Sequence, residues 1–133
     1  MPSDSEDYIG GRVVVGDSFT GRGDISAYDL TQAGMTLDGT PHDWDISGIV
    51  PAGTTRVLVG IRISDGGIGQ YVALSNEGYE NFINASWIYT AVTNKTNYNE
   101  FEIPVDPDNL ILSYATVAAA IDVISLYIKG WWT

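Results

Sequence analysis

The segment RVLVGIRIS, residues 56–64, decides the fold of this chain. Every second residue from Val57 to Ile63 is apolar and β-branched. The other positions of the segment include two arginines and a glycine. Successive side chains of a β-strand point to opposite faces, so the pattern predicts a strand with one face in a hydrophobic core. The turn sequence DGG, residues 65–67, predicts that the chain reverses directly after this strand.

The rest of the chain repeats this character. Short runs rich in Val, Ile, Thr and Tyr are separated by Gly, Asn, Asp and Pro, and no stretch carries apolar residues at helical spacing between two caps. We therefore expect an all-β fold, an antiparallel two-sheet sandwich that is jelly-roll-like and has about eight strands. The expected strands besides residues 56–64 are residues 12–15, 34–37, 42–46, 70–74, 83–92, 99–105, 110–114 and 121–129.

The first 30 residues differ from the others in composition. They are rich in Gly, Ser and Asp and contain one short apolar run. We expect residues 1–30 to form a flexible acidic N-terminal arm with one short strand, and residues 31–133 to form the β-sandwich domain. Segments of such composition become ordered when they contact a partner.

The charge and the composition of the chain exclude several classes of partner and site. Seventeen acidic residues against six basic ones give a formal charge of −11, and nucleic acid binding requires Lys and Arg that neutralise phosphates. No run approaches the roughly 20 apolar residues of a membrane helix, so we expect no membrane insertion. The absence of cysteine excludes disulfides and thiolate metal sites.

One local match suggests hydrolase chemistry. Residues 13–20, VVVGDSFT, resemble the strand and Gly-Asp-Ser block of the SGNH esterases, which would make Ser18 the nucleophile. The only histidine, His42, lacks the Asp-x-x-His pair of that family, because Asp38 has the wrong spacing. We therefore expect no enzyme, and we interpret His42 as a structural residue. The RGD tripeptide at residues 22–24 is interpreted as an exposed turn.

Two pairs of carboxylates are candidates for a metal site. Asp43 and Asp45, like Asp106 and Asp108, are two residues apart and share one face of an extended segment. Each pair could hold a hard cation through its oxygens, but DPDN at residues 106–109 also has the composition of a turn. We expect no cofactor and no metal site, with calcium at Asp106 and Asp108 as the alternative.

The tryptophans are the candidates for partner or ligand binding. Trp44, Trp87, Trp131 and Trp132 could stack on sugar rings or supply rigid contact area at an interface. The alternative is that Trp44, Trp87 and one residue of the terminal pair fill the core. Trp131 and Trp132 are neighbours and must face opposite ways in a strand, so the outward ring of the pair indicates assembly into an oligomer.

From Asp43 onward, about two thirds of the chain resembles a known β-sandwich domain. This domain is found at the C-terminal ends of tail-fibre and other appendage proteins of tailed bacteriophages. The residues that carry the resemblance are DISGIVPAG (45–53), the strand at 56–65, NAS (84–86), LILSY (110–114) and ISLYIKGWW (124–132).

The resemblance implies a non-enzymatic virion protein that is often trimeric and exposed on the particle. We expect a homotrimer that also contacts a capsid or tail protein and is assembled in the host bacterial cytoplasm. A short chain with its own acidic arm suits a capsid decoration protein or a small head or tail appendage subunit. The alternative function is a carbohydrate- or receptor-binding sandwich that recognises a host surface glycan through exposed Trp and Tyr.

Overall fold

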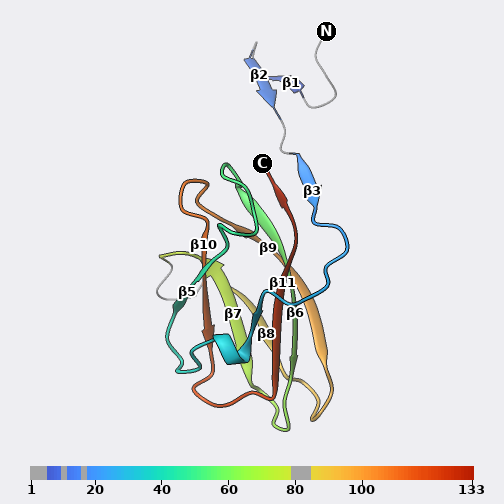
Figure 1. Cartoon of the computed structure of the whole chain (residues 1–133), viewed down its shortest axis with the longest axis vertical. Coiled ribbons are helices and arrows are strands. Elements are labelled where there is room, and N and C mark those ends of the chain that lie inside the picture. The colour runs from blue at the N-terminus through green and yellow to red at the C-terminus, as the bar shows by residue number, and fades with distance from the viewer. Residues whose placement is uncertain (1–5, 10–11, 16–17, 79–84) are drawn as a thin grey trace.

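The computed structural model describes the backbone of residues 6–9, 12–15, 18–78 and 85–133, and the side chains of the last two ranges. These residues form eleven strands and one short 3-10 helix (Figure 1). Nine strands build a five-stranded and a four-stranded antiparallel sheet, which confirms the predicted all-β sandwich. The other two, β1 (Glu6–Ile9) and β2 (Arg12–Val15), pair with each other.

The two large sheets face each other as the layers of the sandwich (Figure 1). The five-stranded sheet has the order β3 (Phe19–Gly21), β11 (Val123–Trp132), β6 (Arg56–Ser64) and β9 (Asn97–Pro104), with β4 (Leu30–Thr31) also paired to β11. The four-stranded sheet has the order β5 (His42–Asp45), β10 (Ile111–Thr116), β7 (Tyr71–Asn76) and β8 (Ser86–Tyr89). From β4 to β11 every connection except that between β7 and β8 crosses between the sheets, which gives the jelly-roll arrangement.

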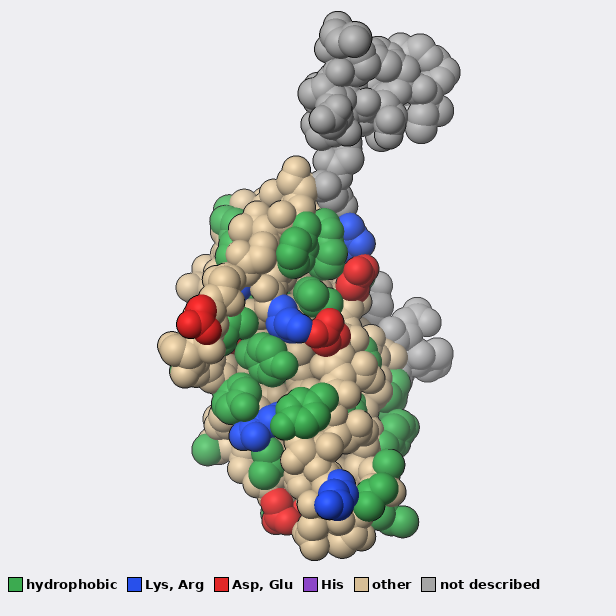
Figure 2. Space-filling model, turned by 90° about the vertical axis from the view of Figure 1, so that its right-hand side faces the viewer, with side chains coloured by type: hydrophobic (Ala, Val, Ile, Leu, Met, Phe, Trp, Pro, Cys, Tyr) green, Lys and Arg blue, Asp and Glu red, His purple; other side chains and the backbone are tan. Residues whose placement is uncertain are grey.

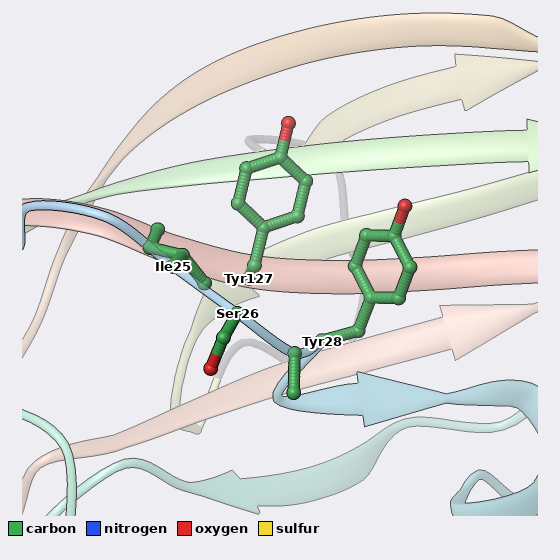
Figure 3. A pocket seen from close by; sticks show the side chains of 5 residues that line it. Ile25, Ser26, Tyr28 and Tyr127 are labelled. Carbon is green, nitrogen blue, oxygen red and sulfur yellow. The ribbon is translucent and has the colours of Figure 1, made fainter.

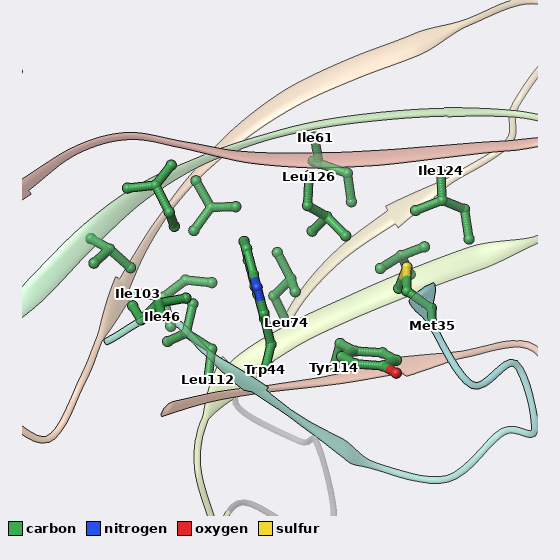
Figure 4. Packing of buried hydrophobic residues seen from close by; sticks show 14 of the residues in the cluster. Met35, Trp44, Ile46, Ile61, Leu74, Ile103, Leu112, Tyr114, Ile124 and Leu126 are labelled. Carbon is green, nitrogen blue, oxygen red and sulfur yellow. The ribbon is translucent and has the colours of Figure 1, made fainter. Parts of the chain in front are cut away.

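The core lies between the sheets and is built by the predicted faces of the strands. The β-branched residues at every second position of β6, from Val57 to Ile63, have no exposed surface, and the same holds for Ile124, Leu126 and Ile128 of β11. Figure 4 shows Ile61, Ile124 and Leu126 pointing toward residues of the four-stranded sheet, Leu74 among them. The strict alternation of apolar and polar residues thus places one face of each strand in the core.

One predicted strand, at residues 34–37, is wrong. The chain forms the 3-10 helix η1 (Gln32–Gly34) there and then continues without regular structure. Met35 turns its side chain into the core, and the Thr36 N–H donates to the hydroxyl of Tyr114 at 2.8 Å instead of to a neighbouring strand. The other predicted strands are present, with ends that differ by at most three residues, and residues 83–84 lie outside the described part.

The segment that we predicted as an arm contains more regular structure than one short strand. Besides β1 and β2, it includes β3, which pairs with the C-terminal end of β11, and it ends at β4, which pairs further along the same strand. Residues 19–31 therefore follow one edge of the sandwich. Residues 1–5, 10–11 and 16–17 of the predicted arm lie outside the described residues.

Candidate functional site

The four tryptophans lie in three different environments. Trp44 is a core residue with 6% of its surface exposed (Figure 4), so its ring offers no surface to a ligand. Trp131 packs against the core from β11, whereas Trp132 and Trp87 lie on outer faces of the sandwich. The core alternative therefore holds for Trp44 and for one residue of the terminal pair, and it is wrong for Trp87.

A β-bulge decides which of the terminal tryptophans faces outward. The register of β11 against β6 shifts between Ile128 and Gly130, so that Gly130 lies opposite Leu58 on the outer face. An extra residue in a strand inverts the alternation of faces beyond it. Without the bulge, Trp132 would share the core face with Ile128, but with the bulge Trp131 takes that place.

Trp132 belongs to an aromatic and cationic group at the C-terminal end of β11. The ring centroid of Phe19 lies 4.7 Å from that of Trp132, and the guanidinium carbon of Arg56 lies 4.4 Å from the centroid of the Trp132 ring. Phe19 is 49% exposed although it is a large apolar residue. We call Phe19, Arg56 and Trp132 the terminal aromatic cluster.

A second aromatic group lies on the outer face of the four-stranded sheet. Tyr71 of β7 lies opposite Tyr89 of the edge strand β8, and its ring centroid is 5.1 Å from that of Trp87. The rings of Trp87 and Tyr89 are parallel to within 10°, with centroids 6.2 Å apart. Trp87 and Tyr89 are 37% and 49% exposed. We call Tyr71, Trp87 and Tyr89 the aromatic platform.

The segment between β3 and β4 forms a cavity of about 310 Å³ over β11. Its lining comes from residues 25–28 on one side and Tyr127 on the other. Figure 3 shows the rings of Tyr28 and Tyr127 beside each other with both hydroxyl groups on the same side. Their centroids are 5.8 Å apart. We call this cavity the tyrosine pocket.

An ion pair holds the wall of the tyrosine pocket on the sheet. Arg22 donates to both carboxylate oxygens of Asp29, at 2.5 and 2.9 Å. Asp29 also accepts from the backbone N–H of Ile128 at 2.8 Å, and Arg22 donates to the carbonyl of Ile128 at 3.2 Å. The two side chains thus pair with the backbone of β11 in the gap between β3 and β4, as a neighbouring strand would. We call Arg22 and Asp29 the edge clamp.

The edge clamp includes the arginine of the RGD tripeptide. Gly23 has φ of +87° and Asp24 is exposed, so residues 22–24 make a turn at the surface. The guanidinium of Arg22, however, is engaged by Asp29 and by the backbone of Ile128. The arginine of this tripeptide is therefore part of the fold.

The candidate metal ligands Asp106 and Asp108 lie in a turn. Asp106 accepts the Asp108 N–H through its side chain at 2.9 Å and the Leu110 N–H through its carbonyl at 2.9 Å. Asp43 and Asp45 both point outward from β5, and Asp45 accepts from the N–H of Ser47. Within residues 18–78 and 85–133, no three His, Asp or Glu side chains come together as a group that could hold a metal ion.

The residues of the hydrolase match are not joined in the structure. Ser18 pairs with Thr133 through backbone hydrogen bonds, and no hydrogen bond described for these residues joins its side chain to His42. His42 contacts Asp38 and Thr40 through the same ring nitrogen, Nε2, at 2.8 and 3.2 Å. A relay needs one partner on each ring nitrogen, and this arrangement does not provide it.

The contact with His42 holds the pKa of Asp38 below its usual value. The hydrogen bond from His42, followed by those from Thr40, lowers the pKa of Asp38 from 3.8 to about 2. Because the pKa is lower in the folded state, the contribution to stability is complete above pH 3.8 and is lost as the pH falls to about 2. We expect the carboxyl resonance of Asp38 to titrate near pH 2 by NMR. In the His42→Ala variant the midpoint should rise toward 3.8, and an unchanged midpoint would contradict the assignment of the cause.

No protein-family model matches the chain, and no curated protein matches it in sequence. No helix of the described residues is long and apolar enough to cross a membrane. The fold and the surfaces define a jelly-roll β-sandwich that presents aromatic side chains at three separate places, the terminal aromatic cluster, the aromatic platform and the tyrosine pocket.

Proposed function

We propose that this protein is a non-enzymatic virion component displayed on the surface of a bacteriophage, either a capsid decoration protein or an appendage subunit. It assembles with itself as a homotrimer and contacts a shell or tail protein, with the acidic residues before β3 as the segment that contacts the shell. The terminal aromatic cluster is the observation that carries the assembly part of the proposal.

The composition of the cluster is that of an interface. Trp, Tyr, Phe and Arg are enriched where proteins contact each other, and a few such residues supply most of the binding free energy. Phe19 leaves half of its surface exposed and lies against Trp132, which is flanked by Arg56. A second copy that covers this cluster would remove the exposed aromatic surface from water.

Replacement of Trp132 by alanine is expected to dissociate the trimer. The substitution removes the ring that contacts both Phe19 and Arg56, and truncation of such a central aromatic residue costs about 2 kcal/mol or more of binding free energy. Light scattering over a dilution series should give the mass of three chains for the natural protein and a lower mass for Trp132→Ala. Thermal unfolding checks that the variant is folded.

Trp87→Ala is the matched control, because it removes a tryptophan from the outer face of the other sheet. It should leave the mass unchanged. A natural protein that is monomeric at all concentrations would contradict the trimer, and a folded Trp132→Ala variant that stays trimeric would contradict the role of the cluster.

The aromatic platform favours a second function, the binding of a host surface glycan. Sugar rings stack on exposed aromatic faces, and Trp87 and Tyr89 present two parallel rings on an edge strand. Binding should change the tryptophan fluorescence of the natural protein and not that of Trp87→Ala. If no glycan from the host envelope changes the emission, this second function is wrong.

A further inference from the structure

The tyrosine pocket is preformed by features of the sheet beneath it. Gly60 of β6 lies opposite Tyr127 of β11, and a Cβ atom at this position would come within 2.4 Å of the Tyr127 ring. The glycine therefore lets the ring lie flat against the sheet. The opposite wall, residues 25–28, is held by the edge clamp and by the pairing of β4. Both walls are thus fixed before any ligand arrives.

Arg62 differs from the other cations near the pocket in its pairing with carboxylates. Figure 2 shows the outer face of the five-stranded sheet, on which hydrophobic side chains lie among Lys, Arg, Asp and Glu. Three cations on or beside this face are paired with carboxylates, in the pairs Arg22–Asp29, Arg56–Glu102 and Lys129–Glu100. Arg62 makes no ion pair within the described part of the chain.

Arg62 is oriented next to the pocket. Its Nε donates to the hydroxyl of Ser125 at 3.1 Å, and its guanidinium carbon lies 4.6 Å from the centroid of the Tyr28 ring. No hydrogen bond described for this chain uses its two terminal nitrogens. A guanidinium held in this way has two parallel donors left for a carboxylate, which it binds in bidentate geometry.

We infer that the tyrosine pocket binds a pyranose unit that carries a carboxylate, such as a uronic or a sialic acid. The two tyrosine rings offer apolar faces for a sugar ring, and their hydroxyls offer hydrogen bonds. The volume of about 310 Å³ is at the lower end of ligand pockets and suits one ring. In a chain with a net charge of −11, a cation without a carboxylate partner supplies the local attraction that an anionic ligand needs.

The inference does not depend on the terminal aromatic cluster or on the aromatic platform. The test measures binding of galacturonate, glucuronate and N-acetylneuraminate oligosaccharides to the full chain by calorimetry and by saturation-transfer NMR. The matched ligands are the methyl esters of the same oligosaccharides, which keep the rings and lose the charge. We expect at least one acid to bind and its ester to bind about tenfold more weakly or worse, since a charge-assisted hydrogen bond is lost.

Two variants assign the binding to the pocket. Arg62→Gln should weaken binding of the acid by about tenfold or more and leave binding of the ester unchanged. Lys95→Gln is the control, because it removes an exposed cation that does not line the pocket. Tyr28→Ala should weaken both the acid and the ester, since it removes a wall of the pocket.

The outcomes of this test distinguish failure of the pocket inference from failure of the proposed assembly. Failure of every acid to bind, or equal losses in Arg62→Gln and Lys95→Gln, would overturn the inference. A trimer that binds no acidic sugar leaves the assembly proposal intact, whereas a monomer that binds the acid supports the pocket and contradicts the trimer. Binding that is lost in Trp87→Ala and kept in Arg62→Gln would place the sugar on the aromatic platform and overturn the inference.

Discussion

Replacement of Asp29 by alanine is expected to lower the free energy of unfolding by about 2 kcal/mol or more, somewhat below the range found when one partner of a fully buried ion pair is removed. Only 9% of the Asp29 side chain is exposed. The substitution leaves the guanidinium of Arg22 without its carboxylate and the N–H of Ile128 without its acceptor. Urea unfolding followed by tryptophan fluorescence measures the loss.

Asp24→Ala is the matched control for this prediction, because it removes an exposed carboxylate from the same segment. It should change the free energy of unfolding by no more than about 0.5 kcal/mol. Asp29→Asn should fall between the two, since an amide oxygen still accepts from Ile128 but carries no charge. If Asp29→Ala unfolds at the same urea concentration as Asp24→Ala, the edge clamp contributes nothing to stability.

Much of the sandwich could be predicted from the sequence because its strands bury one face only. In β6 and β11 a branched apolar residue stands at every second position, from Val57 to Ile63 and from Ile124 to Ile128, and these residues are buried. Such a pattern depends only on the geometry of a single strand. The predicted strands agree with the structure where the pattern is regular, and the prediction fails at residues 34–37, where a tyrosine hydroxyl satisfies the backbone.

The candidate sites depend on relations that no local pattern contains. The bulge at Lys129 exchanges the faces of Trp131 and Trp132, and the local sign of it in the sequence is Gly130, a glycine inside a strand. The edge clamp joins residues seven positions apart to a backbone about one hundred residues later, and the tyrosine pocket follows from the same contact. The sequence pattern indicated the tryptophans but not Tyr28, Tyr127 or Arg62. The signal for the tyrosine pocket was Gly60, a glycine inside a strand, which marks a close approach of another group.

Replacement of Gly130 by alanine is expected to lower the free energy of unfolding by about 3 kcal/mol, the upper range for overpacking of a filled site. A Cβ atom there would lie 2.3 Å from the Phe19 ring and 2.6 Å from the carbonyl oxygen of Thr20. The ring can rotate away, but the carbonyl belongs to β3, which pairs with β11 at this point. Relief of the clash therefore requires β3 to move off the sheet.

Gly60→Ala is the informative comparison, because the same added methyl group meets only a side chain. Its nearest neighbours are atoms of the Tyr127 ring, the closest at 2.4 Å, and this half-buried side chain can turn aside where a backbone carbonyl cannot. We expect a loss of about 1 kcal/mol in urea unfolding together with loss of acidic sugar binding, because the displaced ring is a wall of the tyrosine pocket. Gly130→Ala should show a larger loss of stability and a smaller loss of sugar binding, because it leaves the residues that line the pocket unchanged. Equal stability of the two variants would contradict this expectation. It would mean that β3 is displaced as readily as a side chain and is not a fixed part of the sheet.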